Sequence, residues 1–204
     1  MQLDAVRRVF RTLNRYFMVP MFRLGLGSFI VNPFSGYIMA MKTIGNKSGQ
    51  TRYAPMNYAI QENNVYCMAG FGQITHWYRN LRANPRVELL MPGGNMTGIA
   101  EPVTDPSERL RALRQILKNG GLAGFFMGFN PHTAPDEQVV EKCEGRPVIR
   151  IRPVGITRGA ADPGGWLWLL WAGVVAAPIL MRWLGKKRKC RQAAAVSRFR
   201  AGRS

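Results

Sequence analysis

The sequence predicts a mainly β fold with α-helices: an antiparallel β-barrel with helices packed outside it, followed by a C-terminal membrane helix. Segments with the composition of β-strands outnumber segments with the composition of helices. Each connection is hairpin-like or carries a single short helix, and no βαβ unit repeats, which argues against a parallel sheet. The 204 residues have room for one such domain with appendages.

Residues 1–24 are predicted to form a basic amphipathic helix. Val6, Phe10, Leu13 and Phe17 recur at helical spacing, and the arginines fall largely on the other side. Two interpretations stay open: an ordinary surface helix docked on the domain, or a helix that lies in a membrane interface. The pattern is not that of a secretory signal, because charges interleave with the apolar residues.

Three predicted strands follow a loop-rich passage that comes after Pro20, the residue expected to end or bend the helix. Residues 36–44 are mostly apolar, as in a buried strand, and residues 52–60 and 65–70 also have strand composition. The asparagines between the last two segments suit a tight hairpin turn. These two strands are therefore expected to be antiparallel neighbours.

The loop between the first two strands is basic and bracketed by glycines. Gly45 and Gly49 allow backbone conformations with positive φ, so the loop can direct N–H groups at an anion while Lys47 and Arg52 add positive charge. This chemistry suits a phosphate. The alternative is an ordinary β-turn with two solvated cations. The stretch matches neither GxxxxGK[ST] nor GxGxxG, since it leads into a strand rather than a helix.

In the second half of the chain, the best-marked element is a helix that starts at an Asp105 N-cap. Pro106 and Glu108 complete a capping-box-like start. The other expected elements are a helix over residues 74–83, a hairpin of strands over 87–91 and 96–103, a short helix over 136–143 and an alternating strand over 148–153. Residues 122–129 are apolar but broken by glycine, and fit either a segment over a hydrophobic pocket or a buried connector.

The C-terminal part is predicted as a linker over residues 156–165, a hydrophobic membrane-anchor helix over 166–185 and a basic tail over 186–204. Residues 164–181 carry no charged side chain, close to the ~20 residues that cross a bilayer, and tryptophans stand at both ends as in aromatic belts. A buried core helix is the alternative. The positive-inside rule places the basic tail in the cytoplasm, which for one full crossing would place the domain outside. The catalytic domain is nevertheless expected in the cytoplasm, either because the anchor enters only one leaflet or because the flanking charges and the folded domain override the tail.

The formal net charge of +18 is concentrated at the two ends of the chain. Because no basic face interleaved with aromatics appears in the centre, this distribution favours membrane lipids as partners and predicts no nucleic-acid partner. The three cysteines lack CxxC spacing and the two histidines have no cluster of potential ligands around them. Neither a metal site nor a nucleophile–base pair is therefore expected.

Four segments together resemble the deazaflavin-dependent nitroreductase and quinone reductase family. They are the glycine loop in residues 45–57, residues 69–72, the Trp-Tyr-x-Asn-Leu-x-Ala-Asn-Pro spacing of residues 77–85 and the last strand. The resemblance implies a split antiparallel β-barrel, FMN-binding-like, over residues 25–155. It also implies coenzyme F420, an 8-hydroxy-5-deazaflavin with a phosphate and a polyglutamate tail, with FMN as the alternative cofactor.

By this resemblance, one set of residues would bind the cofactor. Asn46, Lys47, Ser48 and Arg52 would hold the phosphate and tail. The ring and ribityl chain would be lined by Tyr53, Ala54, Pro55, Met56, Asn57, Met68, Ala69, Gly70, Phe71, His76, Trp77, Tyr78, Arg79 and Asn80. No catalytic side chain is expected, because the cofactor supplies the reaction while the protein positions it and excludes water.

The expected function is a membrane-associated oxidoreductase that transfers a hydride from reduced F420 to a lipophilic acceptor, such as a quinone, an enone or an unsaturated lipid. Characterised members of the family use tyrosines late in the chain around the acceptor, whereas residues 122–129 offer phenylalanines and a methionine, which argues against nitro-group reduction. The alternative is a non-catalytic module that binds a flavin, haem or lipid at the membrane. The oligomeric state stays open.

Overall fold

The computed structural model describes residues 8–9, 11–31, 35–125, 127–157, 177–178, 181 and 183. The chain divides into two compact units, Met1–Asp162 and Pro163–Ser204. Apart from four isolated residues, the predicted anchor at 166–185 lies outside the described residues, as does the basic tail. Within the described ranges, no helix is both long enough and apolar enough to span a membrane.

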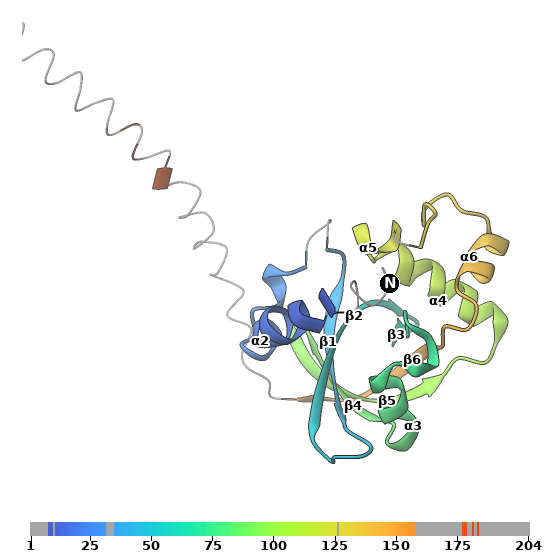
Figure 1. Ribbon diagram of the computed structural model, residues 1–204, viewed down its shortest axis with the longest axis horizontal. Coiled ribbons are helices and arrows are strands. Elements are labelled where there is room, and N and C mark those ends of the chain that lie inside the picture. The colour runs from blue at the N-terminus through green and yellow to red at the C-terminus, as the bar shows by residue number, and fades with distance from the viewer. Residues whose placement is uncertain are drawn as a thin grey trace, which may run out of the picture. The chain divides into compact units, whose positions relative to one another are not determined.

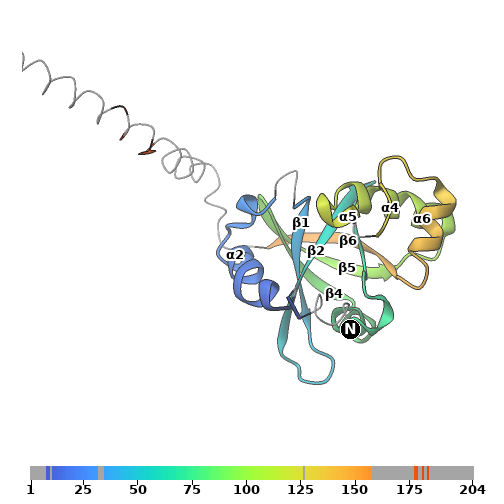
Figure 2. The same cartoon turned by 45° about the horizontal axis from the view of Figure 1, so that its top comes forward.

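Six antiparallel strands close into a barrel in the order β1-β2-β3-β6-β5-β4 (Figures 1 and 2). Their bounds are β1 (Ile38–Ile44), β2 (Thr51–Gln61), β3 (Asn64–Met68), β4 (Arg86–Met91), β5 (Gly94–Pro102) and β6 (Val148–Thr157). The predicted antiparallel barrel is confirmed. β6 continues into the range predicted as a linker, because Ile156 and Thr157 still pair with Met96 and Asn95 of β5.

Residues that tolerate positive φ form the two hairpin turns. Glu62 and Asn63 connect β2 to β3 with φ of +49° and +61°, as a type I′ turn requires at both central positions. Gly93 connects β4 to β5 with φ of +87°. The predicted hairpin between these two strands is confirmed, and Gln61 pairs with Asn64, the first residue of β3.

Three helices cover one side of the barrel. α4 (Pro106–Lys118) packs on β2 and β3, and α5 (Leu122–Phe125) and α6 (Asp136–Lys142) pack on α4 (Figure 1). α4 begins as predicted, with the Asp105 carboxylate accepting a hydrogen bond of 2.7 Å from the Glu108 N–H. α3 (His76–Ala83) follows β3 after a short 3₁₀ turn, η3 (Gly72–Ile74). It packs on the barrel interior rather than on the outer surface, through Leu81.

Alternation along the strands separates an interior core from two outer ones. Met39 and Met41 of β1 point into the barrel and pack with Leu89 and Ile151, whereas Ala40 between them faces outward. The second core lies between the barrel and α4. It includes Ala59, Tyr66, Leu113, Ile116, Val139 and Val148.

The segment over residues 122–129 combines both structures that the sequence left open. Leu122 and Phe125 are exposed, while Met127 and Phe129 pack into the second core. The exposed part fits a segment at a binding surface, and the packed part is a buried connector.

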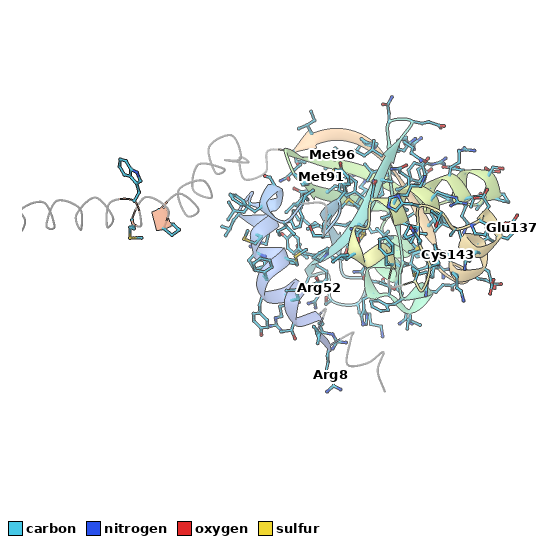
Figure 3. All side chains as sticks on the ribbon, turned by 90° about the horizontal axis from the view of Figure 1, so that it is seen from above. Arg8, Arg52, Met91, Met96, Glu137 and Cys143 are labelled. Atoms are coloured by element: carbon cyan, nitrogen blue, oxygen red, sulfur yellow. The ribbon has the colours of Figure 1, made fainter. Side chains whose placement is uncertain are left out.

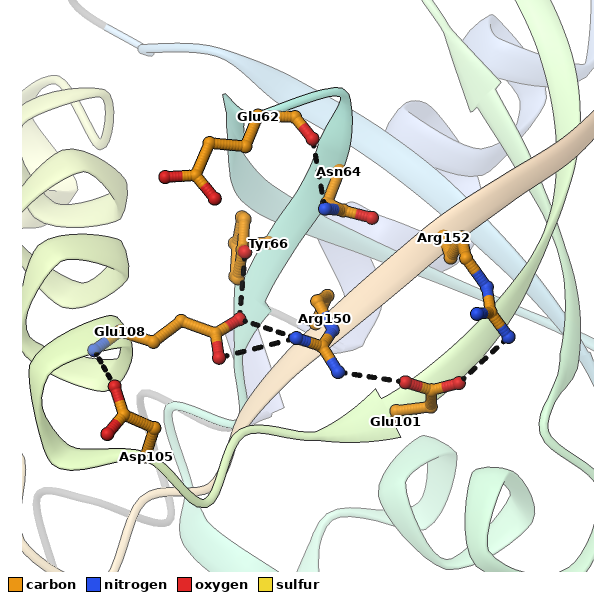
Figure 4. A network of polar contacts seen from close by, with 8 residues as sticks. All are labelled: Glu62, Asn64, Tyr66, Glu101, Asp105, Glu108, Arg150 and Arg152. Carbon is orange, nitrogen blue, oxygen red and sulfur yellow. Dashed lines mark hydrogen bonds and ion pairs between the residues drawn. The ribbon is translucent and has the colours of Figure 1, made fainter.

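A charged network fastens α4 to three strands (Figure 4). The Arg150 guanidinium donates to Glu108 at 3.1 Å and to Glu101 at 3.0 Å. The Tyr66 hydroxyl donates to the same Glu108 carboxylate at 2.8 Å, and Arg152 donates to Glu101 at 3.2 Å. Burial, together with the bond to Glu108, raises the pKa of Tyr66.

The N-terminal helix does not end at Pro20. A π-helical turn, η1 (Asn14–Met18), leads directly into α2 (Val19–Arg23), and a 3₁₀ turn, η2 (Gly27–Phe29), follows. Pro20 stands near the start of α2, directly after the π-helical turn, and so lies inside a continuous helical run. In the π-turn the Val19 N–H donates to the Asn14 carbonyl, a local departure from the i→i−4 pattern that a proline interrupts. The sequence left open whether Pro20 ends or bends the helix, and the helix does not end there.

The docked side of this helix differs from the apolar stripe read in the sequence. Met18 and Phe22 are buried in a third core against Ala40 and Leu90. Leu13 and Phe17, half of the predicted stripe, are exposed. The helix therefore packs on the barrel through one apolar side and presents another to the surroundings.

Candidate functional site

The loop between β1 and β2 is a closed turn. The Gly45 N–H donates to the Gln50 carbonyl at 2.8 Å, and the Gly49 N–H donates to the Gly45 carbonyl at 2.8 Å. Gly49 has φ of +64°, a conformation that strains any residue with a Cβ. Within the described part of the chain, the N–H groups of Lys47 and Ser48 have no hydrogen-bond partner. Only part of the loop's N–H groups is thus left for a ligand.

Cations around this loop lack carboxylate partners among the described residues. Lys47, Arg52 and Arg79 are exposed, and Arg52 donates only to the Gln50 side chain, at 3.1 Å. Other cations of the barrel do have carboxylate partners, as Lys42 has in Glu88 at 2.5 Å. The sequence has no aspartate or glutamate between Asp4 and Glu62. Uncompensated charge of one sign makes this part of the surface attractive to anions.

Asn80 of α3 ties the helix to the loop. Its side-chain carbonyl accepts a hydrogen bond of 3.1 Å from the Asn46 N–H, and its amide donates to the Thr43 hydroxyl at 3.1 Å. Asn80 and Thr43 are both buried. This predicted cofactor residue therefore positions the loop, and its polar groups are already engaged within the protein.

β2 and β3 diverge at the predicted ring site. Their pairing stops at Tyr58 and Cys67, whereas β3 continues beside β6 to Met68 and β2 continues beside β1. The two predicted ring-lining stretches, residues 53–57 and 68–71, lie on the two sides of this divergence. The structure thus places both stretches at one feature of the barrel.

Three predicted residues, one aliphatic and two aromatic, each pack against the interior core of the barrel. Met56 of β2 and Trp77 and Tyr78 of α3 are partly buried against the interior core. The rings of Trp77 and Tyr78 meet edge to face, with centroids 6.3 Å apart. Such a surface suits a flat heteroaromatic ring.

Other predicted residues point elsewhere. The side chain of Met68 packs in the second core against α4, and Tyr53 packs in the third core against α2. The Asn57 amide donates to the Tyr37 carbonyl at 3.1 Å, and the Ala69 N–H donates to the Pro147 carbonyl at 2.9 Å. Alternation along β2 and β3 explains the outward side chains of Tyr53, Asn57 and Met68, which a run of consecutive residues could not reveal.

The remaining predicted residues differ in exposure. Ala54 and Pro55 of β2 are partly buried, while Gly70, Phe71 and His76 are exposed.

Arg23 is a residue near the site that the sequence did not single out. Its guanidinium lies over the ring of Tyr53, 5.4 Å from the centroid. Arg23 comes from α2, so the N-terminal helix adjoins a predicted cofactor residue. The long stretch without acids is a signal in the sequence that could have pointed to this surface.

Cys67, in the interior core, is not a candidate nucleophile. Burial raises the pKa of the Cys67 thiol to about 12, so it is a neutral core residue. No group of potential metal ligands occurs in residues 8–157 as described. A depression on α4 and α6 is lined by four acids, by Arg109 and by Val140; the acids are Asp136, Glu137, Glu141 and Glu144. It contains none of the predicted residues, and four acids against one cation disfavour an anion there.

Comparison with known proteins gives one family. A sequence model of the F420H(2)-dependent quinone reductase family matches residues 19–121. No curated protein matches the chain.

Solved structures with similar folds share little sequence with the chain. A conserved hypothetical protein from Mycobacterium tuberculosis is 20% identical, with 59% of this chain and 74% of that chain covered and a TM-score of 0.44. A putative 5-nitroimidazole antibiotic resistance protein from Bacteroides thetaiotaomicron is 14% identical, with 59% and 75% covered and a TM-score of 0.45. An F420 reductase is 20% identical, with 64% and 94% covered and a TM-score of 0.41.

Proposed function

Because the chain belongs to the F420H(2)-dependent quinone reductase family, we propose that it works at a membrane and transfers a hydride from reduced F420 to a lipophilic acceptor. Membership of the family makes the protein an F420-dependent reductase with coenzyme F420 as its cofactor. We add two points to that assignment. One is the membrane association, and the other is the class of acceptor: a quinone, an enone or an unsaturated lipid.

The observation that carries the proposal is the uncompensated charge of the β1–β2 loop. Lys47 and Arg52 are exposed without carboxylate partners among the described residues, and F420 carries a phosphate and a polyglutamate tail. Hydrogen bonds from such cations to an anion are stronger than hydrogen bonds between neutral groups. We assign the phosphate and tail to these two side chains and to the N–H groups of Lys47 and Ser48.

The apolar side chains of Met56, Trp77 and Tyr78 support a position for the deazaflavin ring beside this loop. When bound, the deazaflavin supplies the hydride. The protein's part is to hold the ring against this surface at the divergence of β2 and β3 and to keep water away from the reacting carbon. Asn80 contributes indirectly, because it fixes the loop relative to α3.

Membrane association rests on two sequence features. The predicted anchor at 166–185 is uncharged through residue 181, and the predicted tail at 186–204 is strongly basic. An anchored enzyme meets acceptors that dissolve in the bilayer at high local concentration. A quinone, an enone or an unsaturated acyl chain meets that description.

The test is oxidation of reduced F420 by acceptors in two phases. The full chain is reconstituted in vesicles that contain a long-chain quinone, and absorbance of the oxidised cofactor is followed. A short-chain quinone with the same headgroup, dissolved in water, is the matched control. We expect faster turnover with the bilayer quinone. Turnover only with the water-soluble quinone would contradict the proposed acceptor class, and binding of F420 without any turnover would favour a non-catalytic module.

A further inference from the structure

The N-terminal helix has an apolar face that no described part of the chain covers. Its large side chains are exposed to the following extents: Val9 66%, Leu13 46%, Tyr16 71%, Phe17 50% and Leu24 62%. Spacings of three and four residues place them on one side of a helix. The docked side chains, Met18 and Phe22, occupy a different side. The exposed face is therefore additional to the one that holds the helix on the barrel.

Arginines without acidic partners accompany this face. Arg8, Arg11, Arg15 and Arg23 are exposed, and within the described part of the chain none of them forms an ion pair with a carboxylate. Arg15 lies over the ring of Tyr16 at 5.4 Å. Figure 3 shows Arg8 projecting from the N-terminal end of the helix, away from the barrel. Apolar and cationic groups thus occur together on one helix.

We propose that this face is a lipid-contacting surface that lies in the headgroup region of an anionic membrane. Large apolar side chains enter the boundary between headgroups and acyl chains to a depth of about 5–10 Å, while arginines reach the phosphates. A second copy of the chain is a poorer occupant, because two such faces would bring uncompensated arginines together. The inference rests on the proposed function in taking a membrane as the enzyme's place of action.

The position of the helix links this surface to the cofactor site. Arg23 covers Tyr53, and Phe22 packs in the same core as Tyr53. β2, which carries the predicted residues 53–57, therefore lies directly behind the helix. A helix that rests on lipid would hold this strand close to the bilayer, where a lipophilic acceptor is dissolved.

A fluorescent label on the helix tests the inference independently of the predicted anchor. In the full chain with Cys190→Ser, an environment-sensitive maleimide dye is attached at Leu13→Cys, since Cys67 and Cys143 are buried. The control carries the dye at Glu137→Cys on α6, which is exposed and lies across the domain from the helix (Figure 3). Each protein is mixed with phosphatidylcholine vesicles, with and without phosphatidylglycerol.

We expect the dye at position 13 to shift to shorter wavelength and to be quenched by brominated lipids, while the dye at position 137 does neither. Arg8→Gln, Arg11→Gln and Arg15→Gln together should weaken the lipid-dependent shift more than about tenfold in apparent affinity. An unshifted dye at position 13 on protein that still floats with the vesicles would overturn the inference. A shift that needs no vesicles and grows with protein concentration would overturn it in favour of self-association.

A second variant connects the surface to turnover. Leu13→Ser with Phe17→Ser removes exposed apolar groups outside the cofactor site, so F420 affinity and thermal stability should not change. We expect a several-fold lower rate with the bilayer quinone and an unchanged rate with the short-chain quinone. An unchanged ratio of the two rates would contradict a lipid-bound helix. If neither quinone reacts with the parent protein while the dye at position 13 of the labelled protein still shifts, the proposed function is contradicted and the lipid surface stays supported.

Discussion

Asn80 and Thr43 form a hydrogen bond of 3.1 Å between two buried side chains, one on α3 and one on β1. The second polar group of Asn80 accepts from the Asn46 N–H in the basic loop. One side chain thus fixes the loop relative to both the helix and the barrel. The buried Asn80 side chain therefore determines the position of the loop that carries the cations.

Asn80→Ala should therefore impair both folding and cofactor binding. Loss of the amide leaves the Thr43 hydroxyl and the Asn46 N–H without partners, which costs about 1–3 kcal/mol of unfolding free energy, measured by urea denaturation. Released from α3, the loop should also bind F420 more weakly in a fluorescence titration. Thr43→Val is the control, because it removes only the bond to β1. Equal loss of F420 affinity in the two variants would show that the loop is not held through Asn46.

Lys47→Ala together with Arg52→Ala should weaken F420 binding at least tenfold, about 1.4 kcal/mol. The cause is the loss of two cations that face the phosphate and tail, and the slope of affinity against salt concentration should fall as well. Unfolding free energy should stay within about 0.5 kcal/mol of the parent, since both side chains are exposed. Arg111→Ala, on α4, is the control: it removes an exposed cation that has no carboxylate partner among the described residues. If it weakens binding as much, general charge rather than the loop attracts the cofactor.

Local sequence patterns predicted the helices and strands. The positions of the site's side chains depend instead on contacts between residues that are distant in the sequence. The N-cap at Asp105 and the alternation of residues 148–153 in β6 could be predicted because each depends on neighbours in the sequence. The outward direction of Met68 and the contact of Arg23 with Tyr53 depend on how strands and helices pack across the barrel. Asn80 was identified as a site residue by resemblance, but its structural role became visible only with Thr43 beside it.

Gly36→Ala should be among the most damaging glycine substitutions. Gly36 has φ of +76°, and an added Cβ would overlap the Asn119 carbonyl oxygen and approach the Gly120 carbonyl carbon to 2.6 Å. Backbone must move, so we expect a loss of more than about 4 kcal/mol in unfolding free energy. Gly145→Ala is the control, with φ of +68° and open space around the Cβ; its strain alone should cost about 1–2 kcal/mol. Similar losses in the two variants would show that the contact at Asn119 relaxes easily.

The Cys67 thiol should make the protein less stable in alkali. Burial raises its pKa to about 12, from 9.0 for an unperturbed thiol. Below pH 9 the thiol is neutral in both states and has no effect. Between about pH 9 and 12 the unfolded chain loses this proton and the folded protein keeps it, so unfolding free energy falls by up to about 1.4 kcal/mol per pH unit.

Cys67→Ala isolates this contribution from the tyrosines and the other cysteines, which titrate in both proteins. The variant should be less stable at pH 7, because it leaves a small cavity in the interior core, yet its stability should fall less steeply above pH 9. Urea denaturation at intervals from pH 7 to 11 measures the two slopes, and parallel curves would mean that water reaches the thiol in the folded barrel. Since Cys67 is the last β3 residue paired with β2 before the strands diverge, such access would show that the interior opens at the predicted ring site.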